Sequence, residues 1–411
     1  MKMRFDTVKS CTLALCTVAW FGTFQGCTDS KPAASNAAGS TASPAAVNSP
    51  AAVNSPAAVN SPAAVNSPAA VNSPGPVSAG NSTSKPATFT LAWSEYPSWS
   101  IFGVADEVGL IDGKEGQMGS IEKKYNVDIK LVLASYDSCI TLYGNSQADG
   151  VCITNIDILG AAGSRNSVAI LPTSTSAGAD ACIVAGVNSI EELAGKPTRG
   201  LEKSVSQYCF DRCLEKLGKN PADFPFSQMD PEQAALAFQG KNDGINSIMV
   251  WNPFVMQSIR SRSDAKVLFS SETIPEEIID MVVLGKDSLS KPGGDAFAKA
   301  LVETFYTMTQ RMANPKTSDE TLIGIGARFA KLELEDMKTI VQQTKFFSDP
   351  NDAKRLFADE RFQKETMPLV SKFCVKYGLT TTPVELSYGD AKGLMDFSTK
   401  YISGYAESQT K

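Results

Sequence analysis

Short apolar stretches of strand length alternate with stretches of helical pattern along residues 87–254. This alternation is typical of parallel sheets that are covered by helices. Strands are predicted at 88–92, 127–134, 150–154, 167–172, 181–185, 197–200 and 247–250, and helices at 102–110, 137–143, from 155, at 189–194 and from 204 to about 217. From Gly293 onward the pattern is almost entirely helical, with breaks at Pro315, Pro350 and Pro383. The predicted fold class is therefore α/β with a helical C-terminal region.

The first residues carry an export signal instead. Lys2, Arg4 and Lys9 precede an apolar run, 11–24, which has the length of a signal-peptide core and is too short to span a membrane comfortably. We predict a signal peptide over 1–26. Gly26 and Cys27, followed at once by polar residues, resemble a bacterial lipobox, so we expect Cys27 to be lipidated. Cleavage near this point without lipidation is the alternative.

Residues 27–86 are predicted to be a linker. The hexapeptide Pro-Ala-Ala-Val-Asn-Ser recurs along 44–73. A proline at every sixth position breaks helices, and the segment has no large apolar side chains to bury. We therefore expect an extended, solvated tether that holds the folded part, 87–411, near a membrane.

Composition excludes several functional classes. The formal net charge is −6, which disfavours a protein that binds nucleic acid by neutralising phosphates. The chain has no histidine, so a Ser-His-Asp triad, a Cys-His dyad and a histidine-ligated metal or haem are excluded. Cys209 and Cys213 have the spacing of core residues on one helical face. The sequence leaves open whether any two cysteines of the exported chain form a disulfide, and we expect no metal and no cofactor.

Candidate binding residues follow the predicted strands, because ligands of open α/β sheets lie beyond the carboxyl ends of strands. Hydroxyls, amides and aromatic side chains recur at these points. Ser204 or Ser206 is suited to cap the helix that follows, which leaves backbone N–H groups for an anionic or carbonyl oxygen. Trp251 follows a buried strand that Pro253 ends, and we expect its indole to form a wall of a pocket.

The order of these elements carries a resemblance to a known family. The segments 202–208 and 247–254, together with 189–197, are similar to the solute-binding proteins of nitrate/sulfonate/taurine-type ABC importers, which are related to thiamine-pyrimidine-precursor binders. The resemblance implies a two-lobed, type 2 periplasmic-binding-protein fold, in which each lobe is a mostly parallel sheet flanked by helices. It places the first lobe at 87–176 and 283–411, the second lobe at 177–282, and hinge strands near 173–180 and 266–283.

The resemblance also implies which residues line the cleft between the lobes. Carried onto this sequence, they are Trp93, Glu95, Tyr96, Trp99, Tyr136, Asp137, Ser138, Thr154, Asn155, Ser174, Ser204, Val205, Ser206, Trp251 and Asn252. Asn246 and Asn252 stand where the family usually has aspartates. Lys203 is the only cation in these loops, whereas Glu95, Asp137 and Glu202 are acidic. We therefore expect a neutral or cationic nitrogen-containing ligand, held against aromatic walls, rather than a sulfonate.

The predicted function is that of an extracytoplasmic solute-binding lipoprotein of an ABC importer. It would clamp a small solute between its lobes and deliver it to a membrane permease that is driven by an ATPase, without chemical turnover and as a monomer. Two alternatives stay open: an enzyme on the same fold, related to pyrimidine-precursor synthesis, in which Glu95 and Asp137 act as acid and base, and a ligand-binding sensor without transport.

Overall fold

The computed structural model describes residues 85–241, 244–328, 332–389 and 391–410. The predicted signal peptide, the lipidation of Cys27 and nearly all of the predicted linker at 27–86 lie outside the described residues. The chain from Gly80 onward forms one compact unit. Within the described residues, no helix is both long and apolar enough to cross a membrane.

A seven-stranded sheet, in the order β11-β12-β4-β10-β3-β1-β2, forms the first lobe. Three of its central strands are buried along their whole length, as expected for a sheet covered by helices on both faces. The strands are β1 (Ala87–Trp93), β2 (Val127–Leu133), β3 (Gly150–Thr154), β4 (Ser167–Thr175), β10 (Ile279–Gly285), β11 (Leu386–Ser387) and β12 (Met395–Phe397), and the helices of its N-terminal half are α1 (Pro97–Glu107), α2 (Ser120–Tyr125), α3 (Tyr136–Gly144) and α4 (Asp157–Ala162).

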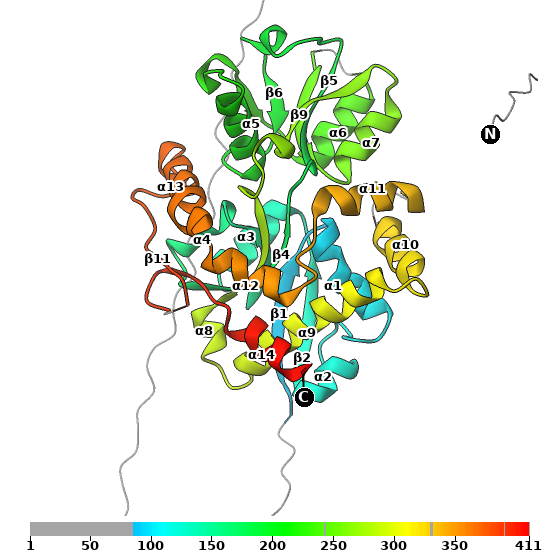
Figure 1. The fold of residues 1–411 in the computed structure, drawn as a ribbon, viewed down its shortest axis with the longest axis vertical. Coiled ribbons are helices and arrows are strands. Elements are labelled where there is room, and N and C mark those ends of the chain that lie inside the picture. Colours follow the sequence, from blue (N-terminus) through cyan, green and yellow to red (C-terminus); the bar gives the residue numbers. More distant parts are fainter. Residues whose placement is uncertain (1–84, 242–243, 329–331, 390, 411) are drawn as a thin grey trace, which may run out of the picture. The chain divides into compact units, whose positions relative to one another are not determined.

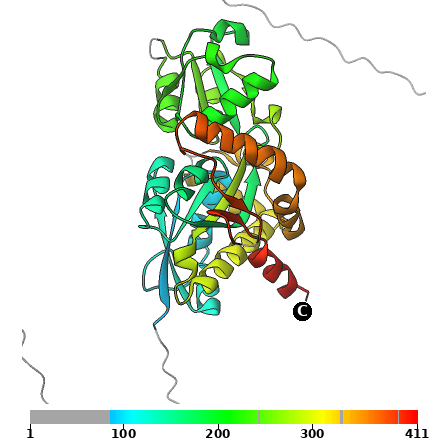
Figure 2. The ribbon, with the colours of Figure 1, turned by 90° about the vertical axis from the view of Figure 1, so that its left-hand side faces the viewer.

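A five-stranded sheet, in the order β7-β6-β8-β5-β9, forms the second lobe. Figure 1 shows its strands with α5, α6 and α7 around them, and Figure 2 shows the same green group from the side. Its elements are β5 (Asp180–Ala185), β6 (Thr198–Gly200), α5 (Val205–Lys216), β7 (Phe226–Gln228), α6 (Pro231–Gln239), β8 (Ser247–Trp251), α7 (Phe254–Ser261) and β9 (Ala265–Ser270). The predicted two-lobed α/β class is confirmed.

The chain crosses between the sheets twice. It leaves the first sheet after β4 and enters the second at Asp180, and it returns after β9 to enter the first sheet at Ile279. The predicted limit at 282/283 therefore falls inside β10 rather than at the crossing. Both entering strands run antiparallel to their neighbours, β5 to β8 and β9, and β10 to β3 and β4, whereas the other strand pairs are parallel.

The C-terminal region is mostly helical, as predicted, but it also completes the first sheet. Its helices are α8 (Lys286–Leu289), α9 (Gly294–Ala313), α10 (Ser318–Arg328), α11 (Leu334–Thr344), α12 (Pro350–Ala358), α13 (Met367–Lys376) and α14 (Lys400–Ser408). The short strands β11 and β12 were missed, because two or three residues are too few to show a strand period. The first helix was also misplaced: α1 begins at Pro97, where the fixed φ of proline suits a first turn, rather than at 102.

Apolar packing is continuous between the lobes. One cluster of buried side chains includes Phe89 and Phe297 in the first lobe, stacked at 4.9 Å between ring centroids, and also Leu214 and Met249 in the second. A smaller cluster lies between the second sheet and α6 and α7. The predicted core position of Cys209 and Cys213 is confirmed, and every cysteine among the described residues is buried and free.

Candidate functional site

A small cavity lies where the two lobes meet. Its walls are Tyr96, Trp99, Tyr136, Thr154, Ile278 and Asp280 on the side of the first lobe, and Asp180, Val205 and Trp251 on the side of the second. The cavity measures about 10 Å³, roughly the space that one water molecule requires. The lobes are thus nearly closed on each other around it.

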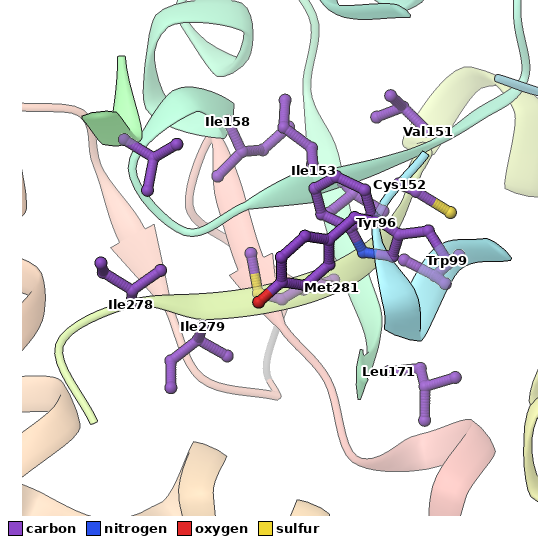
Figure 3. Packing of buried hydrophobic residues seen from close by; sticks show 14 of the residues in the cluster. Tyr96, Trp99, Val151, Cys152, Ile153, Ile158, Leu171, Ile278, Ile279 and Met281 are labelled. Carbon is purple, nitrogen blue, oxygen red and sulfur yellow. The ribbon is translucent and has the colours of Figure 1, made fainter. Parts of the chain in front are cut away.

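Aromatic rings form most of this wall. Tyr96 and Trp99 lie side by side over strand β10 near Met281, with 5.0 Å between ring centroids (Figure 3). Trp99 stacks on Tyr136 at 5.6 Å, and Tyr136 meets the edge of Trp251 at 5.5 Å. The last contact joins α3 of the first lobe to β8 of the second. Such a chain of rings offers flat apolar surface and π faces to a ligand.

Two buried carboxyls, one from each lobe, line the cavity. Asp180 is the first residue of β5 and is 3% exposed, and Asp280 is the second residue of β10 and is 2% exposed. The Oδ2 atom of Asp180 accepts a hydrogen bond from the Ser176 hydroxyl at 2.6 Å, and the Oδ2 atom of Asp280 accepts one from the Ser174 hydroxyl at 2.5 Å. No lysine or arginine is among the described residues that line the cavity.

Burial dominates the acid–base behaviour of these two groups. Loss of hydration raises the pKa of Asp180 to about 7, against the lowering effect of the Ser176 hydrogen bond, and nearby Asp157 raises it further. Burial also raises the pKa of Asp280 well above its usual range, and repulsion from Asp180 adds to the shift. The closed, ligand-free pocket therefore favours protonated, neutral carboxyls.

A third aspartate joins the two lobes. The Oδ2 atom of Asp157 accepts hydrogen bonds from the Tyr136 hydroxyl at 2.7 Å, the Thr154 hydroxyl at 3.0 Å and the Val205 backbone N–H at 3.2 Å. Burial raises its pKa to about 6 despite these bonds. Val205 is the first residue of α5, so a carboxyl of the first lobe occupies the N-terminus of a helix in the second. The partial positive charge at this end of a helix favours a carboxylate there.

The predicted helix cap was correct, but the predicted open helix end was not. Ser204 caps α5 by accepting a hydrogen bond from the Ser206 backbone N–H at 3.2 Å. The backbone N–H of Val205, the first residue of α5, donates its hydrogen bond to Asp157. In this closed arrangement a protein carboxyl stands where sequence analysis had placed a ligand oxygen.

Several buried polar atoms at this junction lack a hydrogen-bond partner within the described part of the chain. They are the Trp99 indole nitrogen, the Asn252 Oδ1 atom and the Ser206 hydroxyl. The Tyr96 hydroxyl is close enough to Asp280 and Asp180 for both carboxyls to raise its pKa, after burial as the main cause. An unpaired buried polar group costs on the order of 1–3 kcal/mol. Of Trp99, Asn252 and Ser206, only Trp99 lines the cavity, so its indole N–H is the one suited to pairing with a molecule bound there.

The predicted site residues fall into three groups. The structure brings together, around the cavity, Tyr96, Trp99, Tyr136, Thr154, Val205 and Trp251. Neighbouring grooves contain Glu95 on one side and Asp137 with Ser204 on another. The cavity wall does not include Trp93, Ser138, Asn155, Ser174, Ser206 or Asn252.

Some of the residues outside the wall support it from behind. Asn155 accepts a hydrogen bond from the Ile279 backbone N–H at 2.9 Å and so fixes the start of β10. Ser174 bonds Asp280, and the Asn252 side-chain amide donates to Gln343 of α11 at 2.8 Å. Trp93 is a core residue, and Ser138 is exposed on the first turn of α3.

Sequence analysis missed Asp180, Ile278 and Asp280. Only residues that follow a predicted strand were considered, and these lie at the ligand-binding edge of a sheet when its strands are parallel. Strands β5 and β10 run antiparallel to their neighbours, so their starting ends face the cleft. A signal was present: each aspartate stands at the beginning of an otherwise apolar run, where a carboxylate is rarely buried unless it has a partner.

Two sheets of α/β type, joined by two crossings and meeting at a pocket lined from both, define the periplasmic-binding-protein fold, and the chain has this fold. Neither a protein-family model nor a curated protein matches the chain. Several solved structures match the chain, and they include SsuA-type binding proteins of sulfonate ABC transporters.

The chain is similar to the periplasmic aliphatic sulphonate binding protein SsuA from Escherichia coli, with a TM-score of 0.58 and 14% identity over 72% of this chain and 90% of that one. The alkanesulfonate-binding protein SsuA from Xanthomonas axonopodis pv. citri, bound to MOPS, gives a TM-score of 0.53 and 13% identity. The match covers 69% of this chain and 96% of that one. A Candida albicans protein described as having the generic periplasmic binding protein fold gives a TM-score of 0.53 and 15% identity. The match covers 71% of this chain and 90% of that one. At such identities the likeness establishes the fold alone.

Proposed function

We propose that this protein is the solute-binding component of an ABC importer, anchored outside the cytoplasmic membrane through a lipid on Cys27 and tethered by the linker at 27–86. It binds a small nitrogen-containing solute in the cavity between its lobes and releases it, unchanged, to a membrane permease. The supporting observation is the cavity itself, because its wall is built from both lobes.

Closure around the solute would couple binding to transport. A ligand that contacts both lobes binds the closed form better than the open form, and this difference in affinity shifts the hinge. Protein contacts across the junction add to closure. They include the Asp157–Val205 and Asn252–Gln343 hydrogen bonds, and the hydrogen bond from the Tyr377 hydroxyl of α13 to Asp211 of α5 at 2.5 Å.

The test is to identify a ligand and follow the lobes. The purified full chain is denatured, and any released small molecule is identified by mass spectrometry. The same compound, added back to ligand-free protein, is expected to reduce the radius of gyration in small-angle X-ray scattering and to be recovered unchanged. Conversion of the compound would favour the enzyme alternative, and the absence of any closing ligand would contradict the proposal.

A further inference from the structure

The proposed function leaves the charge of the solute undecided, and the cavity wall carries information on it. Two of the residues that line the cavity are aspartates, and none is basic. The groove beside it, which shares Tyr136 and Trp251 with the cavity, adds the carboxylates Glu95, Asp230 and Glu232. A solute that entered by this route would pass from one acidic environment into another. Such a field raises the local concentration of cations and repels anions.

The two cavity aspartates are placed to bind one ligand jointly. Asp180 belongs to the second sheet and Asp280 to the first. The Oδ2 atom of Asp280 is bonded by Ser174 of the neighbouring strand β4, and that of Asp180 by Ser176, which lies between β4 and β5. Burial is the main cause that raises the pKa of each aspartate, and repulsion from Asp180 adds to the shift of Asp280. A cation between them would favour the ionised form of both carboxyls and would attract both lobes at once. A neutral ligand of the same shape would leave the carboxyls protonated.

The remaining wall suits the same kind of ligand. Trp99, Tyr136 and Trp251 contact one another and line the cavity, and aromatic rings attract a desolvated cation. The indole N–H of Trp99 has no hydrogen-bond partner among the described residues. The Tyr96 hydroxyl lies beside Asp280, so ionisation of Asp280 would strengthen it as an acceptor for this hydroxyl.

We propose that the solute is a small organic cation bearing N–H donors, such as an amidinium or a primary ammonium group, held between Asp180 and Asp280 against these aromatic rings. The proposal rests on the proposed solute-binding function and specifies its ligand class. It separates this chain from the sulfonate-binding proteins whose fold it shares, because a sulfonate offers these two buried carboxyls neither a positive charge nor an N–H donor.

Four small probes of similar size test the proposal by isothermal titration of the full chain: acetamidinium, acetamide, tetramethylammonium and methanesulfonate. Acetamidinium is expected to bind at least about tenfold more tightly than acetamide, since a buried charge–charge contact is worth 1.4 kcal/mol or more. Tetramethylammonium should bind more weakly than acetamidinium because it has no N–H donor. Equal or tighter binding of acetamide, tetramethylammonium or methanesulfonate overturns the proposal, and so does binding of none of the four.

Substitutions of the two aspartates test whether the preference for a cation arises in the pocket. Asp180→Asn and Asp280→Asn should each weaken acetamidinium binding by roughly 30-fold or more, whereas Glu407→Gln, which removes an exposed carboxylate from α14, should change nothing. Unchanged binding by both aspartate variants overturns the assignment. If either variant fails to fold, the order of the four probes on the unmodified protein decides alone. A neutral or anionic compound released from the purified protein would overturn the cation and leave the solute-binding function standing.

Discussion

Asp180 and Asp280 occupy matching positions in the two sheets. Each lies at the start of the strand by which the chain enters one lobe from the other, and each of these strands runs antiparallel to its neighbours. Asp180 is paired with Trp251 and Asp280 with Thr154 in the sheet registers. The crossings that join the lobes therefore also deliver one carboxyl from each lobe to the cavity between them.

Ionisation of these carboxyls should make the ligand-free protein less stable at neutral than at acidic pH. The folded-state pKa of Asp180 is raised to about 7, above its ordinary value of about 3.9. A raised pKa contributes stability that is complete below pH 4 and is lost as the pH rises through 7. We expect the unfolding midpoint in urea to fall over this window. In Asp180→Asn the unfolding midpoint should fall less steeply as the pH rises. Part of the fall should remain, because Asp157, with a pKa of about 6, acts in the same direction. An identical pH profile in the variant would contradict the assignment.

Loss of the Tyr136 hydroxyl should remove support within the first lobe from Asp157, the carboxyl that bonds the second lobe. This hydroxyl donates to Asp157 at 2.7 Å, and a hydrogen bond to a buried acid contributes about 1–3 kcal/mol. Tyr136→Phe is expected to lower the free energy of unfolding by that order in chemical denaturation. The matched control is Tyr306→Phe: the Tyr306 hydroxyl is buried without a partner in the described residues, so its removal should be neutral or stabilising. Equal effects of the two substitutions would refute the account of this contact.

The N-terminal cap of α5 allows a second comparison of one substitution with a matched control. Ser204 accepts a hydrogen bond from the Ser206 N–H and donates one to the Leu201 carbonyl at 2.7 Å. Ser204→Ala should cost about 1 kcal/mol of stability. Ser206→Ala removes a buried hydroxyl with no partner among the described residues and should change the unfolding midpoint little. The reverse order of the two midpoints would show that Ser206, not Ser204, supports this helix end.

One hydrogen bond between the lobes should influence closure more than stability. The Asn252 amide donates to Gln343 Oε1 at 2.8 Å, and a neutral hydrogen bond contributes about 0.5–1.5 kcal/mol. Gln343→Ala should therefore weaken ligand binding by a factor of about 2 to 10 and enlarge the radius of gyration of the ligand-free protein. Gln342→Ala, on the exposed side of α11, is the control. Ligand affinity and radius unchanged in Gln343→Ala would mean that this bond plays no part in closure.

Much of the fold was predictable because the local signals were strong. Strand β3 was predicted at its observed bounds, 150–154, since a short apolar run, Val151 to Ile153, stands between Gly150 and a polar turn. The cap at Ser204 was predicted because a serine precedes an amphipathic run. The strands β11 and β12 were not predictable, because residues far away in the sequence, on β4, provide their pairing.

The candidate site was predictable only in its aromatic part. Tyr96, Tyr136 and Trp251 follow strands that run toward the cleft, so the strand-end rule found them. Asp180 and Asp280 depend on strand direction, which is a property of the sheet rather than of the local sequence. Glu95, one of the acidic residues from which sequence analysis expected a neutral or cationic ligand, lies instead in the groove beside the cavity.

The most direct test of the central claim is a crystal structure of the protein with the ligand that it retains through purification. The account predicts ligand density enclosed by Trp99, Tyr136 and Trp251, with a nitrogen atom within hydrogen-bond distance of both Asp180 and Asp280. Density for the ligand at another place on the molecule, or a ligand that leaves these two carboxyls untouched, would contradict it.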